Sequence, residues 1–281
     1  MNAWDFLWLF LIVGALQPVV ARQFSNAQRR SAIARIERER RSRLILLVHR
    51  QETVSFLGIP FMRYIDLHDA EAVARAIELT DPSTPIDFVI HTPGGLMLAS
   101  VQIARALKRH KGKVTVFVPH YAMSGGALIA LAADEIVMSP NALLGAVDPQ
   151  INGLPASSLL RVVAEKPVAE IDDETLILAD MGRKAVEEIA REARNLLAES
   201  LAPEKAAEIA GVLTEGRWSH DYGLSAAEAK ALGLPISTDM PRDVLALMNL
   251  YPQPLRRTPS VEYSPFRRGP TEAPALRGRR P

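Results

Sequence analysis

Residues 121–134, Tyr-Ala-Met-Ser-Gly-Gly-Ala-Leu-Ile-Ala-Leu-Ala-Ala-Asp, constrain the fold of this chain more than any other stretch. A valine-rich run at residues 114–118 precedes them and predicts a buried strand, and the small apolar residues after Ser124 predict a buried helix. A serine between a strand and a helix lies beside free backbone N–H groups, as nucleophilic serines often do. The alternative of equal weight is a serine that caps the helix, with glycines for close packing.

A second glycine turn lies upstream. Residues 86–90, Ile-Asp-Phe-Val-Ile, predict another buried strand, and Pro93-Gly94-Gly95 follow it, ahead of a helix at residues 97–109. Ligands of open α/β sheets sit at the carboxyl ends of strands, which is where both glycine turns are expected. Their N–H groups together could hold a developing oxyanion. For Pro-Gly-Gly alone, a tight turn is the plainer interpretation.

Strand and helix patterns alternate through the body of the chain and predict a mainly parallel α/β fold. Short strands are also expected at residues 44–48 and 136–138. Asp69 is a plausible N-cap of a helix at residues 69–79. Further helices are predicted at residues 172–198 and 203–213, and at residues 224–233, where Ser225 and Glu228 form a capping box and Gly233 ends the helix.

Composition excludes several classes of protein. The chain has 281 residues, 48% of them hydrophobic, which suits one large domain with appendages. A net charge of +1 gives no electrostatic case for nucleic acid, so no nucleic-acid partner is expected. The chain has 0 cysteines, which removes thiolate nucleophiles and disulfides. No Gly-x-x-x-x-Gly-Lys-Ser/Thr or Gly-x-Gly-x-x-Gly turn is present, and neither a cofactor nor a metal is expected.

The N-terminus predicts a membrane anchor. Residues 3–21 are nearly all apolar and just long enough to span a bilayer, and arginines follow from Arg22, so residues 1–22 are the expected anchor. The positive-inside rule then places the N-terminus outside and the remainder in the cytoplasm, as a single-pass protein of the cell membrane. The alternatives are a cleaved signal or a helix lying on the membrane surface. Residues 23–43 predict a charged, mostly solvated helical stalk, residues 44–251 the folded domain, and residues 252–281 a disordered tail rich in proline and arginine.

Several motifs together resemble the serine peptidases of the ClpP/crotonase fold. They are Thr92-Pro-Gly-Gly95, Ala122-Met-Ser124-Gly-Gly126, Ala132-Ala-Asp-Glu-Ile136 and Leu144-Gly-Ala-Val-Asp-Pro149. Val118-Pro-His120-Tyr-Ala-Met-Ser124 and Trp218-Ser-His-Asp-Tyr222 are similar to the membrane-anchored branch labelled serine dehydrogenase proteinase, which is related to signal peptide peptidase A. The resemblance implies a repeated ββα spiral with an N-terminal transmembrane helix.

The resemblance also implies roles for individual residues. Ser124 would be the nucleophile, and Gly94, Gly95 and Gly125 would supply the oxyanion hole. ClpP uses a histidine soon after the serine, but residues 144–151 contain none. The signal-peptide-peptidase branch uses a lysine further on, and Lys166 follows Ser124 at a similar spacing.

The identity of the general base stays open among several residues. A lysine base must be buried before it can accept a proton near neutral pH, and Lys166 is preferred over Lys184, which lies in a helix rich in charges. His120 and His91 are the candidate histidines, and Asp148 could orient the base. His220 and Asp221 have no further metal ligands near them in the sequence. They are interpreted as structural residues without a catalytic role.

These features predict a membrane-anchored serine endopeptidase that hydrolyses membrane-associated or unfolded proteins through a Ser124/Lys166 dyad. The resemblance implies protein or peptide substrates, a homo-oligomer and a stomatin-like partner. Two alternatives are a crotonase-type acyl-CoA enzyme, which needs acidic catalysts on the helix after the second turn, and a catalytically silent membrane scaffold.

Overall fold

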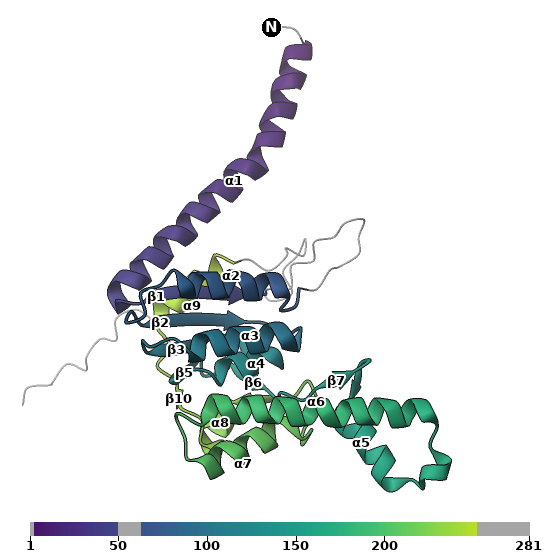
Figure 1. Cartoon of the computed structure of the whole chain (residues 1–281). Helices are drawn as coiled ribbons and strands as arrows, with labels where there is room; N and C mark the ends of the chain where they lie inside the picture. Colours follow the sequence, from purple (N-terminus) through teal and green to yellow (C-terminus); the bar gives the residue numbers. More distant parts are fainter. Residues whose placement is uncertain (1–2, 50–62, 252–281) are drawn as a thin grey trace, which may run out of the picture.

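The computed structural model describes residues 3–49 and 63–251, and within them the side chains of residue 20 and of residues 23 onward (Figure 1). A five-stranded parallel sheet forms the centre of this part of the chain, in the order β1-β2-β3-β5-β10. Its strands are β1 (Arg43–Val48), β2 (Ile86–His91), β3 (Val114–Val118), β5 (Glu135–Met138) and β10 (Ile236–Ser237). The predicted parallel α/β layout is therefore confirmed.

Both faces of the sheet are covered, which explains why its central strands are mostly apolar and fully buried. Every residue of β2 and of β3 is buried. Alternate residues of each strand enter different clusters, so that Phe88 and Ile90 pack with one set of helices and Val89 with another. This packing fixes the strand register and the place where each strand ends.

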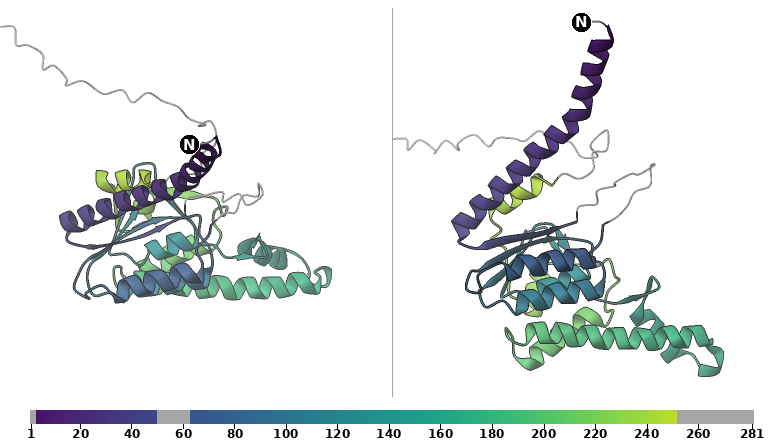
Figure 2. Two further views of the ribbon diagram at one scale, coloured as in Figure 1. Left: turned by 90° about the horizontal axis from the view of Figure 1, so that it is seen from above. Right: turned by 45° about the horizontal axis from the view of Figure 1, so that its top comes forward.

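One face of the sheet packs against α2 (Leu67–Glu78), α3 (Met97–Lys108) and α4 (Gly125–Ala130). The opposite face packs against the C-terminal part of α1 (Ala3–Arg40) and against α9 (Arg242–Asn249) (Figure 2). The three helices of the first face lie between successive parallel strands of the sheet in the chain.

The C-terminal part of α1 is a component of the folded domain, which differs from the solvated stalk expected at residues 23–43. Ile36 is 1% exposed and packs with Phe117 and Leu247. Arg40 forms a two-pronged ion pair with the buried carboxylate of Asp87. The spacing of apolar residues in this helix is sparse, so the sequence did not show that the helix covers the sheet.

A second layer lies at the carboxyl end of the main sheet. It contains a small sheet in the order β4-β6-β9 and a hairpin of β7 and β8. The long helix α6 runs along this layer, and its end projects with α5 as an arm (Figure 1). The elements are β4 (Tyr121–Ala122), β6 (Leu143–Gly145), β7 (Gln150–Ile151), β8 (Leu154–Pro155), α5 (Ala156–Glu165), η1 (Val168–Glu170), α6 (Asp173–Leu197), α7 (Pro203–Thr214), β9 (Gly223–Ser225) and α8 (Ala226–Leu232).

The predicted cap is present at α8, whereas the cap of α2 differs from the prediction. The capping box of Ser225 with Glu228 and the left-handed Gly233 are both present at α8. At α2 the N-cap is Asp66 rather than Asp69. The side chains of these two aspartates each accept a hydrogen bond from the other's backbone N–H, so the helix begins earlier than its apolar pattern indicates.

The part of the chain that the structure describes contains no helix with the length and apolarity that membrane crossing requires. The side chains of residues 1–19, on which the predicted anchor depends, lie outside the described residues, as does the predicted tail at residues 252–281.

Candidate active site

Ser124 lies at a sharp turn between β4 and α4, in a backbone conformation that residues other than glycine rarely adopt. Its φ is 50° and its ψ is −119°, and its hydroxyl makes no capping bond to α4. A non-glycine residue in this region costs on the order of 1–3 kcal/mol and persists where the surrounding structure imposes it. The helix-capping interpretation of Ser124 is therefore wrong, and the hydroxyl is left available for chemistry.

The two glycine turns converge on this serine. A Cβ built on Gly94, whose φ is 108°, would lie 2.8 Å from the Ser124 Cβ and 3.4 Å from its Oγ. A Cβ built on Gly125 would overlap Ser100 Oγ and lie 3.8 Å from the Gly95 nitrogen. Only residues without a side chain let the two loops approach so closely.

The converging loops present two backbone donors. The family resemblance implies that Gly94 contributes to the oxyanion hole. In the structure its N–H donates to the Thr92 hydroxyl at 3.2 Å and is therefore not available to a substrate. No partner within the described residues engages the N–H of Gly95 or of Gly125. Two free N–H groups beside a serine hydroxyl are the arrangement that stabilises the tetrahedral intermediate of acyl transfer.

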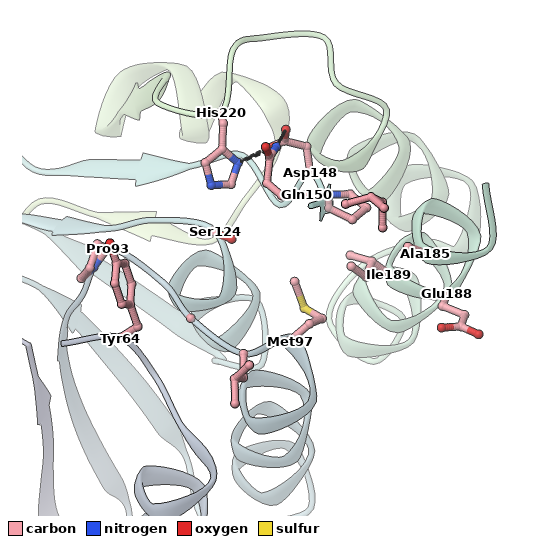
Figure 3. Close-up of a pocket in the computed structure, with 14 residues that line it drawn as sticks. Tyr64, Pro93, Met97, Ser124, Asp148, Gln150, Ala185, Glu188, Ile189 and His220 are labelled. Carbon is pink, nitrogen blue, oxygen red and sulfur yellow. Dashed lines mark hydrogen bonds and ion pairs between the residues drawn. The ribbon is translucent and has the colours of Figure 1, made fainter. Parts of the chain in front are cut away.

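A pocket of about 450 Å³ opens over Ser124 (Figure 3). Its floor is the Pro93–Met97 turn and Ser124, and its far wall comes from α6 and from the segment before β7. Most of its lining is apolar, and the charged or polar side chains in it are few. The polar and charged lining residues are Tyr64, Ser124, Asp148, Gln150, Glu188 and His220.

Two of these polar residues form a hydrogen-bonded pair. His220 Nδ1 lies 2.8 Å from Asp148 Oδ1, and Gln150 Nε2 donates to the other carboxylate oxygen at 3.0 Å. A carboxylate only accepts, so the proton of a neutral His220 ring is on Nδ1 and the lone pair is on Nε2. Figure 3 shows this second nitrogen on the side of the ring that faces Ser124.

The electrostatics of the pair suit a general base. The hydrogen bond that Asp148 accepts from the His220 ring raises the pKa of His220 above its ordinary value of 6.5, although partial burial opposes the shift. Asp148 itself is 2% exposed. A buried carboxylate that fixes the tautomer of an imidazole and stabilises its protonated form is the supporting member of a Ser-His-Asp triad.

His220 is the candidate site residue that sequence reasoning missed. It was interpreted as structural because no metal ligands accompany it, and its partner Asp148 lies 72 positions away in the chain. Its signal was the Trp218-Ser-His-Asp-Tyr222 string, which the family resemblance singled out. The β6–β9 pairing brings this string beside the segment that carries Asp148.

Neither candidate lysine is among the residues that line the pocket over Ser124. Lys166 follows the last residue of α5, is exposed, and is not among the residues that line the pocket. The Lys184 side chain is 62% exposed and pairs with Asp180 at 2.5 Å on α6. Neither lysine has the burial that a lysine base requires.

The other candidate histidines pack against each other at the strand ends. The rings of His91 and His120 are in edge-to-face contact at 5.3 Å between centroids, and neither residue lines the pocket. Among the residues described, no cluster of three or more metal-ligating side chains is found.

A strained serine, two free amides and a histidine–aspartate pair on an α/β scaffold define a serine hydrolase site. A model of the family described as ClpP-like SDH-type serine proteinase matches residues 2–275. The chain belongs to this family and is a serine-type peptidase with a ClpP-like fold.

Known relatives and structures resemble much of the chain. Protein MJ1495 of Methanocaldococcus jannaschii is 49% identical over 265 residues, which cover 94% of this chain and 90% of the relative. A mutant of the 1510-N membrane-bound stomatin-specific protease has a TM-score of 0.44 and 23% identity, covering 66% of this chain and 80% of that one. ClpP1 from Listeria monocytogenes has a TM-score of 0.45 and 20% identity, covering 70% and 92%.

Proposed function

We propose that this protein is a membrane-anchored endopeptidase in which Ser124 attacks the peptide carbonyl and His220, held by Asp148, is the general base. The observation that carries the proposal is that Ser124, Asp148 and His220 all line the same pocket. The crotonase-type alternative needs acidic groups after the second turn, and α4 has only glycine, alanine, leucine and isoleucine.

In the proposed reaction His220 first accepts a proton and then donates it, once in acylation and once in deacylation. His220 Nε2 accepts the Ser124 proton as Oγ bonds to the carbonyl carbon, and the N–H groups of Gly95 and Gly125 hold the resulting oxyanion. His220 then gives this proton to the leaving amine, the C–N bond breaks, and an ester on Ser124 remains. Water, deprotonated by His220, hydrolyses that ester and regenerates the serine.

The Ser124/Lys166 dyad is the competing proposal for the base. It is supported by the family spacing in the sequence, and it requires Lys166 to leave its exposed position and become buried beside Ser124. His220 already lines the same pocket as Ser124 and is hydrogen-bonded to Asp148, whereas Lys166 lies outside that pocket. We therefore favour His220.

Hydrolysis of casein and of a quenched fluorescent peptide tests the proposal. Purified full-length protein in detergent is compared with Ser124→Ala, His220→Ala and Lys166→Ala. We expect activity to vanish in Ser124→Ala, to fall about 10²–10⁴-fold in His220→Ala, and to persist in Lys166→Ala. Added imidazole should partly restore His220→Ala, since the His220 side chain is 33% exposed. Loss of activity in Lys166→Ala, with His220→Ala active, would establish the lysine dyad instead.

Membrane anchoring through residues 1–22 rests on the sequence: an apolar run about as long as a bilayer requires, followed by arginines. The orientation that we propose places residues 23–281 in the cytoplasm. The described backbone continues as one helix from Ala3 to Arg40, so an anchor would be joined directly to the helix that covers the sheet.

Vesicle flotation of the full chain tests the anchor, with Leu9→Arg/Ile12→Arg as the matched variant. The wild-type chain should float and resist carbonate extraction, and the variant should remain in the soluble fraction because two arginines oppose insertion. Resistance of the variant to release would point to a different attachment.

The proposed substrates are unfolded and membrane-associated proteins, including stomatin-like proteins, on the strength of the sequence motifs. We also propose a homo-oligomer, because the α5–α6 arm leaves apolar side chains uncovered in the single chain. These exposed residues are Val162, Val168, Ile177 and Met181. Light scattering of the purified chain, compared with Ile177→Lys/Met181→Lys, measures whether this surface joins copies.

A further inference from the structure

A buried hydrogen-bond network lies behind the oxyanion turn, and Thr92 is its centre. Thr92 is 0% exposed and follows the last residue of β2. Its backbone N–H donates to the Tyr121 carbonyl at 3.2 Å, and its own carbonyl accepts from the Met123 N–H at 3.0 Å. The main chain of Thr92 is therefore tied, on either side of Ala122, to the segment that leads into Ser124.

The side chain of Thr92 holds the other loop. Its hydroxyl oxygen accepts the Gly94 N–H at 3.2 Å and lies 3.3 Å from the Gly94 carbonyl. Gly94 has a positive φ of 108°, which glycine adopts readily, and the hydrogen bond from its N–H to Thr92 fixes the loop in this conformation. With the Gly94 N–H engaged by Thr92, the next N–H, that of Gly95, is the donor that remains for substrate.

His49 and Asp69 complete the network. His49 is 5% exposed, its Nδ1 lies 3.0 Å from the Thr92 hydroxyl, and its Nε2 lies 3.2 Å from Asp69 Oδ2. The carboxylate only accepts, so the proton of a neutral ring is on Nε2, and Nδ1 accepts the Thr92 hydroxyl proton. That choice leaves the oxygen of Thr92 free to accept the Gly94 N–H.

We propose that Thr92 and His49 are positioning residues of the peptidase: Thr92 holds the oxyanion turn in register with Ser124, and His49 orients the Thr92 hydroxyl. The proposal rests on the proposed function of Ser124, and neither residue lines the pocket. An oxyanion donor acts only over a narrow range of distances, and a misplacement of about 1 Å costs about 10²-fold in rate.

The test compares Thr92→Val, which keeps the shape and removes the hydroxyl, with Thr92→Ser, which keeps the hydroxyl. In the full-length protein, we expect Thr92→Val to lower kcat about 10–100-fold with KM changed less than about threefold, and Thr92→Ser to stay within about fivefold of wild type. Affinity for a peptide boronate should fall with kcat in Thr92→Val, while affinity for the uncleaved peptide should not.

His49→Leu tests the second half of the proposal. Alone it should lower kcat about 5–20-fold, and in the Thr92→Val background it should have no further effect, since His49 acts through the lost hydroxyl. Additive losses, or boronate and peptide affinities that fall together, would overturn the proposal. If Thr92→Val does not fold, full activity of His49→Leu overturns it. Wild-type protein without Ser124-dependent hydrolysis would instead refute the proposed function, so the two failures are distinct.

Discussion

His220 and Asp148 are 72 residues apart in the chain, yet His220 Nδ1 lies 2.8 Å from Asp148 Oδ1 in the wall of the pocket that contains Ser124. The order along the chain is serine, aspartate, histidine, as in the α/β-hydrolases. A base at this position would account for catalysis without any lysine.

The pH dependence of hydrolysis follows from this pair. His220 must be neutral to act as the base, and Asp148 raises its pKa above 6.5, so kcat/KM should fall about tenfold per pH unit below a midpoint that exceeds 6.5. In Asp148→Asn the midpoint should move to lower pH, and the plateau should fall about 10²–10⁴-fold because the tautomer is no longer held. A pH profile of both proteins measures this, and an unmoved midpoint would contradict the role of Asp148.

Gly125 and Ser100 should be energetically coupled. A methyl group at residue 125 would overlap Ser100 Oγ and push the Ser124 turn away from Gly95, so Gly125→Ala should lower kcat/KM about 10–100-fold. Ser100→Ala removes that oxygen and should be nearly neutral alone. The double variant should recover at least about threefold relative to Gly125→Ala, and steady-state kinetics of the four proteins measures the recovery. Purely multiplicative effects would mean that the loss has another cause.

The ion pair between α1 and the sheet should contribute to stability. Arg40→Ala leaves the buried Asp87 carboxylate without its cation, which should lower the free energy of unfolding by about 2–4 kcal/mol. The matched control is Arg35→Ala on the same helix, whose pair with Asp243 is exposed on both sides and is expected to contribute less than about 1 kcal/mol. Urea denaturation of both variants gives the comparison, and equal losses would argue that α1 does not depend on this pair.

The Glu228 carboxylate at the start of α8 should stabilise the folded state in a pH-dependent way. Hydrogen bonds from Ser225, then from Tyr222, lower the pKa of Glu228 from 4.5 to about 2. A depressed carboxyl pKa stabilises the folded state above pH 4.5, and this contribution disappears as pH falls from 4.5 to about 2. Glu228→Gln should therefore have a lower Tm at pH 7, with the gap closing over that range, and Tyr222→Phe should be intermediate. A gap independent of pH would show that the Glu228 charge is not involved.

Local patterns predicted much of the fold. The apolar runs at residues 86–90 and 114–118 predicted the positions of β2 and β3, and the serine and glutamate of the capping box predicted the start of α8, because these signals depend on residues a few positions apart. The convergence of the two glycine turns was also predictable, since the carboxyl ends of neighbouring parallel strands lie at one edge of a sheet.

The contacts that sequence reasoning missed join distant segments. His220 reaches Asp148 only because β9 pairs with β6, both of which are 3 residues long and carry little periodic signal. The docking of α1 on the sheet depends on the buried side chain of Ile36 and on the ion pair of Arg40 with Asp87 of β2. The many charged residues of α1 hide this apolar contact in the sequence. The spacing that favoured Lys166 is a one-dimensional measure, and it does not report burial.

Intact-mass and peptide mapping after reaction with a fluorophosphonate is the most direct test that Ser124 is the activated nucleophile. The account predicts a single adduct on Ser124, formed at least about 10²-fold more slowly in His220→Ala and at the wild-type rate in Lys166→Ala. An adduct on another residue, or labelling of Ser124 that depends on Lys166 and not on His220, would contradict it.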